Sequence, residues 1–308
     1  MTNSYSRAAV LIPFLATIGC ASASMDPMDG TEDEQVTETT QEVVSSNRLT
    51  MNRLTMNRLT MNSLSGTKLS PNGKQVSSTT LVNTEDGREV LRYLVRCALP
   101  ESASLTATVN GTTYVFQGLV GLAPDWMVAP LTGTGRRWLT ACLLAHVNGY
   151  GVQVSISVRG GHPALTADMA EHTTYGVQEV SFFGDIFGSD EVEEDDADGP
   201  APAGLPLYAC GGNGVQTSCG SNPATFRPAR SCATPEDCQI QFIGACHDTS
   251  GAGAHVCGTV LGNGYSKCHT TTKTSGSWQY GQTYSEVITV YMAPSDFNAF
   301  YTGCAPAQ

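Results

Sequence analysis

The cysteines constrain the fold of this chain more than any other feature. The sequence contains eleven cysteines, and one of them, Cys20, closes an N-terminal apolar segment. The other ten are Cys97, Cys142, Cys210, Cys219, Cys232, Cys238, Cys246, Cys257, Cys268 and Cys304. An even set of cysteines behind an export signal predicts disulfides. Because the close pairs typical of zinc ligands are missing, we expect no metal site.

The N-terminal segment has the layout of a bacterial export signal. Arg7 precedes an apolar run from Ala8 to Ile18, and Gly19 and Cys20 follow. This pattern predicts a lipoprotein-type signal over residues 1–20 with Cys20 as the lipidated residue. Cleavage at Ala21-Ser22-Ala23 by the ordinary signal peptidase is the alternative, since Thr17 stands where lipoprotein signals usually carry leucine. The apolar run is too short to span a membrane.

Two segments of low complexity follow the signal. Residues 21–46 carry carboxylates and no basic residue, which predicts a disordered acidic tether. Residues 47–65 contain the pentapeptide Asn-Arg-Leu-Thr-Met three times and then a degenerate copy, Asn62-Ser63-Leu64-Ser65. A period of five places the leucines on one face of neither a helix nor a strand. The repeats are therefore either a spacer or a short strip docked onto the following domain.

Residues 66–189, the α+β core, are predicted to contain two helices that each carry a cysteine. The first follows a cap at Asn83-Thr84 and ends before Pro100, and the second covers Arg136 to Val147. Cys97 and Cys142 each lie on the apolar side of one helix. We therefore predict a disulfide between them, which would stabilise the fold by about 4 kcal/mol in the chain-entropy model. Two free buried thiols are the alternative.

The strand signals are alternation of apolar residues and enrichment in β-branched residues. Asn110-Gly111 predicts a tight hairpin turn, and Val152 to Val158 alternates as in a half-buried strand. The expected strands are Leu105–Val109, Thr113–Phe116, Val152–Val158, Val177–Phe183 and Glu286–Met292. The last should return to the sheet of the first half. The predicted fold is α+β, with two disulfide-linked helices packed on a small, mostly antiparallel sheet and a Cys-rich, loop-dominated C-terminal elaboration over residues 200–308.

The negative charge is concentrated in two segments. The tether and the acidic loop of residues 190–199 each hold seven carboxylates, which is half of the 28 in the chain. A net charge of −12 without a basic face argues against nucleic-acid binding. Glu194, Asp196 and Asp198 imitate a calcium loop, but Leu205 stands where the final carboxylate is needed, so we expect no calcium there.

Motifs for catalysis are missing. The sequence has no Gly-x-Ser-x-Gly elbow, no His-Glu-x-x-His, no phosphate loop and no dinucleotide fingerprint, so no cofactor is expected. The histidines are dispersed at His146, His162, His172, His247, His255 and His269. We expect His146 to be a packed or surface residue and His162 to serve a turn before Pro163. Glu171-His172 forms a polar pair in a predicted helix.

Several segments together resemble a group of uncharacterised secreted proteins and lipoproteins from myxobacteria. These segments are Gly121–Trp126, Arg137–Ala145, Gly161–Leu165, Phe183–Phe187 and Glu286–Tyr291. Leucine-centred repeats also occur in that group. The resemblance implies export and a common architecture, and it carries no activity and no functional residues. Together with Ala21 after the cysteine, it favours the outer membrane.

Two hypotheses of function follow. The first is an outer-membrane lipoprotein that acts as a non-enzymatic surface interaction or structural module, held to the membrane by its N-terminal lipid and facing a protein or glycan partner outside the cell. An extracellular, unanchored form is the alternative location. The second hypothesis is a secreted hydrolase with an active site near His162 and Asp185.

Overall fold

A computed structural model describes residues 48–49, 80–150, 153–187, 206–215, 230–232, 239–247, 256–258, 263–274 and 277–301. Residues 43–308 form one compact unit. The predictions for Cys20, the tether, most of the repeats, the acidic loop, Cys219, Cys238, His255 and Cys304 lie outside the described residues. Among the residues that are described, no helix combines the length and the apolar character needed to cross a membrane.

Helix α3 covers Glu85–Ala98 and begins where the sequence predicted. The hydroxyl of Thr84 accepts a hydrogen bond from the Gly87 amide at 3.1 Å, which satisfies one of the free amides at the helix start. Its apolar face is buried, and the short 3₁₀ helix η2 (Thr80–Asn83) packs beside it. Leu99 ends the helix because Pro100 disfavours helical backbone at the residue before it.

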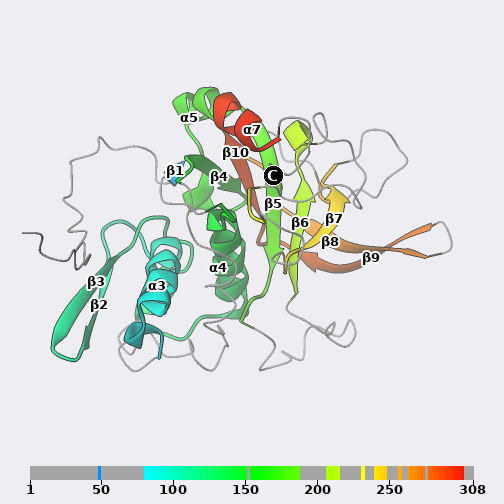
Figure 1. Ribbon diagram of the computed structural model, residues 1–308. Coiled ribbons are helices and arrows are strands. Elements are labelled where there is room, and N and C mark those ends of the chain that lie inside the picture. The colour runs from blue at the N-terminus through cyan, green and yellow to red at the C-terminus, as the bar shows by residue number, and fades with distance from the viewer. Residues whose placement is uncertain are drawn as a thin grey trace, which may run out of the picture. The chain divides into compact units, whose positions relative to one another are not determined.

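A hairpin packs against α3. Strands β2 (Ser104–Val109) and β3 (Thr112–Gln117) pair in antiparallel register about Asn110-Gly111. Both turn residues have positive φ, 50° and 82°, as the predicted two-residue turn requires. The hairpin lies beside α3 (Figure 1), and its inner face buries three side chains, Leu105, Ala107 and Phe116.

Helix α4 covers Gly133–His146 and is buried over most of its length. It begins three residues before the predicted start because Thr132 caps it, accepting from the Gly135 amide at 3.0 Å. α4 lies between α3 and the sheet and contacts β5 and β10 (Figure 1). A helix that is covered on both sides needs apolar residues around most of its circumference, and every residue from Trp138 to His146 is buried.

The main sheet has six strands in the order β1-β4-β10-β5-β6-β7. Their bounds are β1 Arg48–Leu49, β4 Ile156–Gly160, β5 Val177–Gly184, β6 Leu207–Gly211, β7 Gln241–Ala245 and β10 Ile288–Met292. All pairs are antiparallel except β6 with β7. The predicted return of the C-terminal strand is confirmed, since β10 lies between β4 and β5.

Strand β4 differs from its prediction. The alternation of residues 152–158 predicted a half-buried strand, but the strand begins at Ile156 and all five of its residues are buried. The polar face of β4 is covered because helix α5 (Met169–Thr174) packs there and supplies partners to Ser157 and Arg159. The polar residues at alternate positions of β4 therefore face a buried, hydrogen-bonded layer and not solvent.

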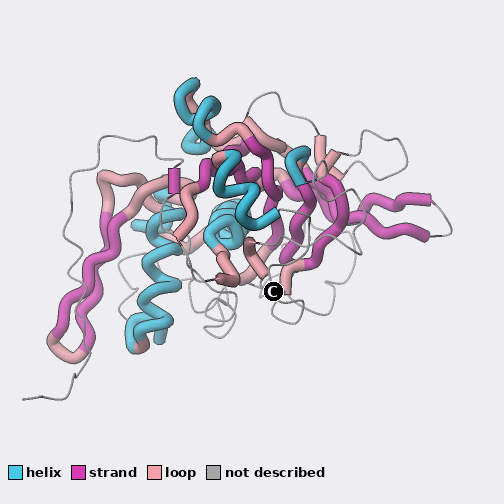
Figure 2. Tube along the Cα trace, turned by 45° about the horizontal axis from the view of Figure 1, so that its top comes forward, coloured by secondary structure: helices cyan, strands magenta, loops and turns pink. Residues whose placement is uncertain are grey.

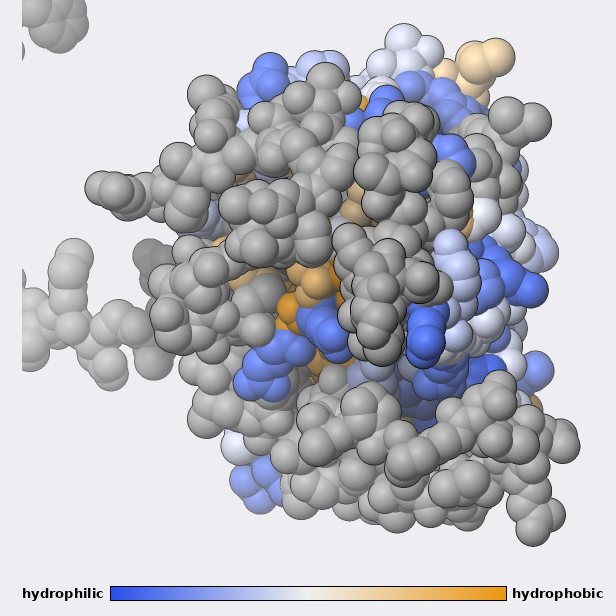
Figure 3. All heavy atoms as spheres, turned by 90° about the vertical axis from the view of Figure 1, so that its right-hand side faces the viewer, coloured by the Kyte–Doolittle hydropathy of each residue, from blue (hydrophilic) through white to orange (hydrophobic). Residues whose placement is uncertain are grey.

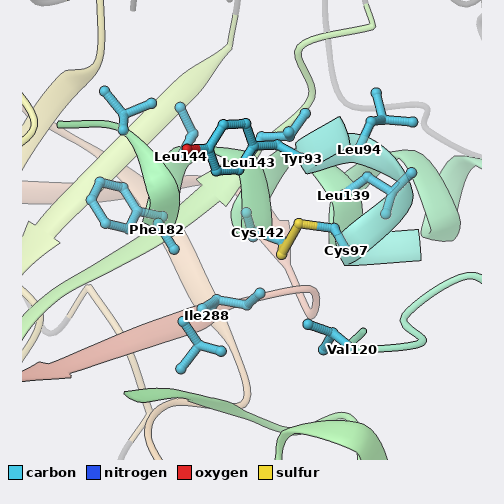
Figure 4. Packing of buried hydrophobic residues seen from close by; sticks show 14 of the residues in the cluster. Tyr93, Leu94, Cys97, Val120, Leu139, Cys142, Leu143, Leu144, Phe182 and Ile288 are labelled. Atoms are coloured by element: carbon cyan, nitrogen blue, oxygen red, sulfur yellow. A yellow bond between two sulfur atoms is a disulfide. The ribbon is translucent and has the colours of Figure 1, made fainter. Parts of the chain in front are cut away.

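The predicted disulfide between Cys97 and Cys142 is present. Their sulfur atoms are 2.05 Å apart and their Cα atoms 6.0 Å apart, and the bond joins α3 to α4 among Leu94, Leu139 and Leu143 (Figure 4). Two more disulfides, Cys210–Cys246 and Cys257–Cys268, brace the C-terminal half. Cys232 is disulfide-bonded as well, so all seven described cysteines are oxidised.

The C-terminal half adds elements that the sequence prediction did not include. Strands β8 (Cys268–Thr274) and β9 (Ser277–Tyr284) form a separate hairpin that extends away from the main sheet (Figures 1 and 2). Helix α7 (Pro294–Tyr301) follows β10 and contacts β5. The 3₁₀ helices η3 (Pro124–Met127) and η4 (Pro163–Leu165) complete the described elements.

Candidate functional site

The loops that carry His162 and Asp185, the two predicted site residues, lie where β4 and β5 end and β10 begins, which we call the loop edge of the sheet. Ile288, at the start of β10, pairs with Gly160 at the end of β4 and with Phe182 near the end of β5. The segments after β4 and β5 and before β10 therefore leave the sheet at the same edge. We call the side chains gathered there the loop-edge cluster: Arg136, Arg137, Trp138, His162, Asp185 and Glu286.

His162 serves its own loop, as the sequence led us to expect. Its Nδ1 accepts a hydrogen bond from the Ala164 amide at 3.2 Å and so caps η4. The ring packs edge-on against Trp138, with the ring centroids 5.2 Å apart. Burial lowers the pKa of His162, which favours the neutral ring. With Nδ1 as acceptor, the single proton of the neutral ring lies on Nε2.

Asp185 is likewise used by its own loop. Its Oδ1 accepts from the Phe187 amide at 2.9 Å. Burial raises the pKa of Asp185, while the hydrogen bond to Phe187 and the nearby Arg136 and Arg137 act in the opposite direction. The loop is held to α4 by Thr140, whose hydroxyl donates to the Arg136 carbonyl at 2.9 Å and accepts from the Ile186 amide at 3.0 Å.

An ion pair that the sequence did not indicate completes the cluster. Arg137 Nε donates to Glu286 Oε2 at 2.9 Å, and the Glu286 side chain is only 9% exposed. The two residues are 149 positions apart, and no local motif connects them. This pair fixes the start of β10 to α4.

His162 and Asp185, the two predicted site residues of the loop-edge cluster, each accept a hydrogen bond from a backbone amide of their own loop. No hydrogen bond joins His162 to Asp185 within the described part of the chain, and a backbone amide occupies an acceptor atom of each. A general base needs a free acceptor within reach of the proton that it takes. The amide of Ala164 occupies the one acceptor nitrogen of the neutral His162 ring, whereas the Asp185 carboxylate has a second oxygen besides the one that accepts from Phe187.

A second polar cluster lies beneath α5 and includes the Glu171-His172 pair. Ser157 donates from Oγ to Glu171 Oε1 at 2.6 Å and accepts from Arg159 Nε at 2.9 Å. Arg159 also donates to His172 Nδ1 at 2.9 Å and stacks over the Tyr291 ring at 3.9 Å. We call these five residues the α5 cluster.

The α5 cluster joins a helix end to the sheet. Arg159 Nη2 donates to the carbonyls of Tyr175 and Glu171 at 2.8 and 3.3 Å, which satisfies carbonyls at the C-terminal end of α5. Glu171 Oε2 is buried and has no hydrogen-bond partner among the described residues. One carboxylate oxygen of this cluster is thus left without the partner that a buried polar atom normally has.

A third buried polar cluster is centred on Glu179 of β5 and connects it to Arg230 and to Tyr301 of α7. Arg230 donates from Nε and Nη2 to the Glu179 carboxylate, both at 3.0 Å, and from Nη1 to the Val147 carbonyl at 2.8 Å. Tyr301 donates to Glu179 Oε1 at 2.9 Å. Burial raises the pKa of Tyr301 well above its ordinary value, and the Glu179 charge raises it further. The phenol therefore keeps its proton and acts as a donor.

His146 is a packed residue, which confirms the structural interpretation of its position on α4. The ring is fully buried beside the Cys97–Cys142 disulfide, with Nδ1 3.9 Å from each sulfur, and it donates to the Cys142 carbonyl at 2.8 Å. Burial, together with the nearby Arg96 and Arg230, lowers the pKa of His146 to about 3, although the hydrogen bond to the Cys142 carbonyl acts in the opposite direction.

We therefore predict that acidification destabilises the fold through His146. An unfolded histidine gains its proton near pH 6.5, whereas the folded ring does so only near pH 3. The contribution of His146 to the free energy of unfolding is therefore complete above pH 6.5. Below that pH, the free energy of unfolding falls by at most about 1.4 kcal/mol per pH unit. Urea denaturation from pH 7.5 to 4.5 measures this slope. His146→Gln should reduce the slope by about one proton, and an unchanged slope would contradict the assignment.

Three histidines remain, all in the C-terminal half, and the structure describes two of them, His247 and His269. His269 Nδ1 and Thr283 Oγ1 are 2.7 Å apart across the β8–β9 hairpin, and the His269 ring packs against Tyr280. His247 lies two residues after the end of β7. The calcium-like residues Glu194, Asp196 and Asp198 lie outside the described residues.

Comparison with protein-family models, with curated proteins and with solved structures finds no match to this chain.

Proposed function

We propose that the protein is an exported lipoprotein, anchored in the outer membrane through Cys20, whose disulfide-braced body is a non-enzymatic interaction or structural module outside the cytoplasm. One observation carries the proposal: all seven described cysteines are disulfide-bonded. Disulfides persist in oxidising compartments and are rare in the cytoplasm. The signal-like segment that ends at Cys20 agrees with this location.

The non-enzymatic role is supported by the use that each candidate residue already has. His162 and Asp185 hold their own loops, and Glu286 is paired with Arg137. The alternative, a secreted hydrolase, is supported by the placement of His162 and Asp185 at one sheet edge. Hydrolysis of an ester, peptide or glycoside that is lost in His162→Gln and in Asp185→Asn would favour the hydrolase.

Exposed strand faces offer a surface for a polar partner. On the outer face of the β2–β3 hairpin, Thr106, Thr108 and Thr113 are exposed and Val115 is 64% exposed. Thr108 and Thr113 are joined through their hydroxyls at 3.0 Å. On the side that carries the β8–β9 hairpin, most of the visible described surface is hydrophilic and a small hydrophobic area lies among it (Figure 3). Hydroxyl-rich, flat faces suit a protein or glycan partner of polar character.

The anchor is tested by removing the lipidated cysteine. We expect wild-type protein to fractionate with membranes and Cys20→Ala to be released into the soluble fraction with altered processing. Ser22→Ala is the matched control, because it changes a neighbouring side chain and keeps the acceptor thiol. Equal solubility of wild type and Cys20→Ala would refute the lipid anchor.

A further inference from the structure

The repeat region supplies a strand to the main sheet. β4 pairs with β10 on one side and with β1 on the other. β1 consists of Arg48–Leu49, which are the second and third residues of the first pentapeptide repeat. The pairing is antiparallel, with Arg48 opposite Ser157 and Leu49 opposite Ile156. The side of β4 that does not pair with β10 thus pairs with the first repeat.

The register matches the alternation within the repeat. Residues directly opposite each other in an antiparallel pair lie on the same face of the sheet. Ile156 is fully buried in the main core, whereas Ser157, on the other face, belongs to the α5 cluster. The leucine of the repeat therefore takes a register position on the apolar face, and the arginine takes one on the polar face.

The polar face has a reason to favour a basic neighbour. Glu171 is 2% exposed, and only its Oε1 is hydrogen-bonded. Arg159, the other charged residue of that face, directs its donors to Ser157, His172 and two carbonyls rather than to the free oxygen. A basic residue at the register position opposite Ser157 is therefore a residue type that suits this face, where the desolvation of a carboxylate is only partly compensated.

The same dipeptide occurs again in Arg53-Leu54 and Arg58-Leu59, each between the same flanking residues. Moving the chain by one repeat restores the same residue at every register position, so the edge cannot distinguish the three repeats by sequence. We propose that the edge of β4 is an acceptor site for an Arg-Leu strand and that any of the three repeats occupies it. The fourth copy is the weakest occupant, since Ser63 replaces arginine.

Exchange between repeats changes the length of chain that precedes the docked strand. Docking of the third repeat in place of the first adds ten residues to that length, which extends its reach by at most about 35 Å. The body would therefore sit at one of three distances from whatever holds the N-terminus. This inference goes beyond the proposed function and does not depend on it, because strand exchange occurs whether or not Cys20 is lipidated.

Hydrogen exchange in full-length variants tests the proposal. With three equivalent occupants, Leu49→Asp should lower the protection of the edge amides of β4 by only about a third. Leu49→Asp combined with Leu54→Asp and Leu59→Asp should lower it at least about tenfold, because no unmodified repeat remains. Equal loss in the single and triple variants would overturn the proposal by showing that only the first repeat docks. Unchanged protection in the triple variant would overturn it as well.

A peptide experiment checks the same site in trans. The peptide Asn-Arg-Leu-Thr-Met-Asn-Arg-Leu-Thr-Met should restore protection of β4 in the triple variant, and the same peptide with both leucines replaced by aspartate should not. Should the triple variant fail to fold by circular dichroism, deletion of residues 52–61 replaces it. That variant keeps one intact repeat, and its protection should fall to about one third of the wild-type value. Full protection in the deletion variant would contradict exchange.

Discussion

Replacement of both Cys97 and Cys142 by alanine is expected to lower the free energy of unfolding by about 4 kcal/mol in the chain-entropy model. The bond closes a loop between residues 45 positions apart and joins two helices that pack against each other. Without it, the unfolded chain regains the freedom that the closed loop removes. Urea denaturation of the oxidised variant, with the other disulfides intact, measures the loss.

The matched control is the pair Cys257 and Cys268, whose bond spans only 11 positions. The same model gives about 3 kcal/mol for this shorter loop, so its removal should cost less than removal of the helix bridge. Peptide mapping of the wild-type protein should join Cys97 to Cys142 directly. Free thiols at both positions would contradict the disulfide, and equal losses in the two variants would contradict the loop-length argument.

Removal of one partner of the buried Arg230–Glu179 pair is expected to have a comparable effect. Neither side chain is more than 1% exposed, and Arg230 also satisfies the Val147 carbonyl. Arg230→Met leaves the Glu179 carboxylate buried without its counter-charge, which costs about 3–5 kcal/mol. Chemical denaturation of Arg230→Met and Glu179→Gln measures the two losses.

A double-mutant cycle separates the pair from simple loss of packing. Arg230→Met combined with Glu179→Gln should cost clearly less than the sum of the single variants, because neither charge is then left alone. Tyr301→Phe removes one hydrogen bond to Glu179 and should cost only about 1–2 kcal/mol. Additive losses, or an Arg230→Met variant as stable as wild type, would show that the pair contributes little.

Local signals predicted the elements that carry their own start and stop residues. Thr84 and Pro100 bound α3, Asn110-Gly111 fixes the β2–β3 hairpin, and the apolar sides of two helices placed Cys97 next to Cys142. These signals act over a few residues, so they can be read without knowledge of the tertiary structure. The α+β class followed from them.

The interactions that the sequence did not indicate are long-range or polar. Arg230 and Glu179 are 51 positions apart and Arg137 and Glu286 are 149 apart, and each pair is defined only once the sheet has formed. Burial of β4 on both faces depends on α5 covering Ser157 and Arg159. For α7 a signal was present, since Pro294 at the first position followed by Asp296 is a typical helix start.

The position of β10 has a consequence for how the chain folds. β4 and β5 do not pair with each other, because β10, the last strand among the described residues, lies between them. A chain shortened before Ile288 would leave two strands without a common partner, and contacts of such large sequence separation form late and slowly. As the chain is made from its N-terminus, α3, α4 and the first hairpin can assemble early. The sheet closes only when β10 has emerged.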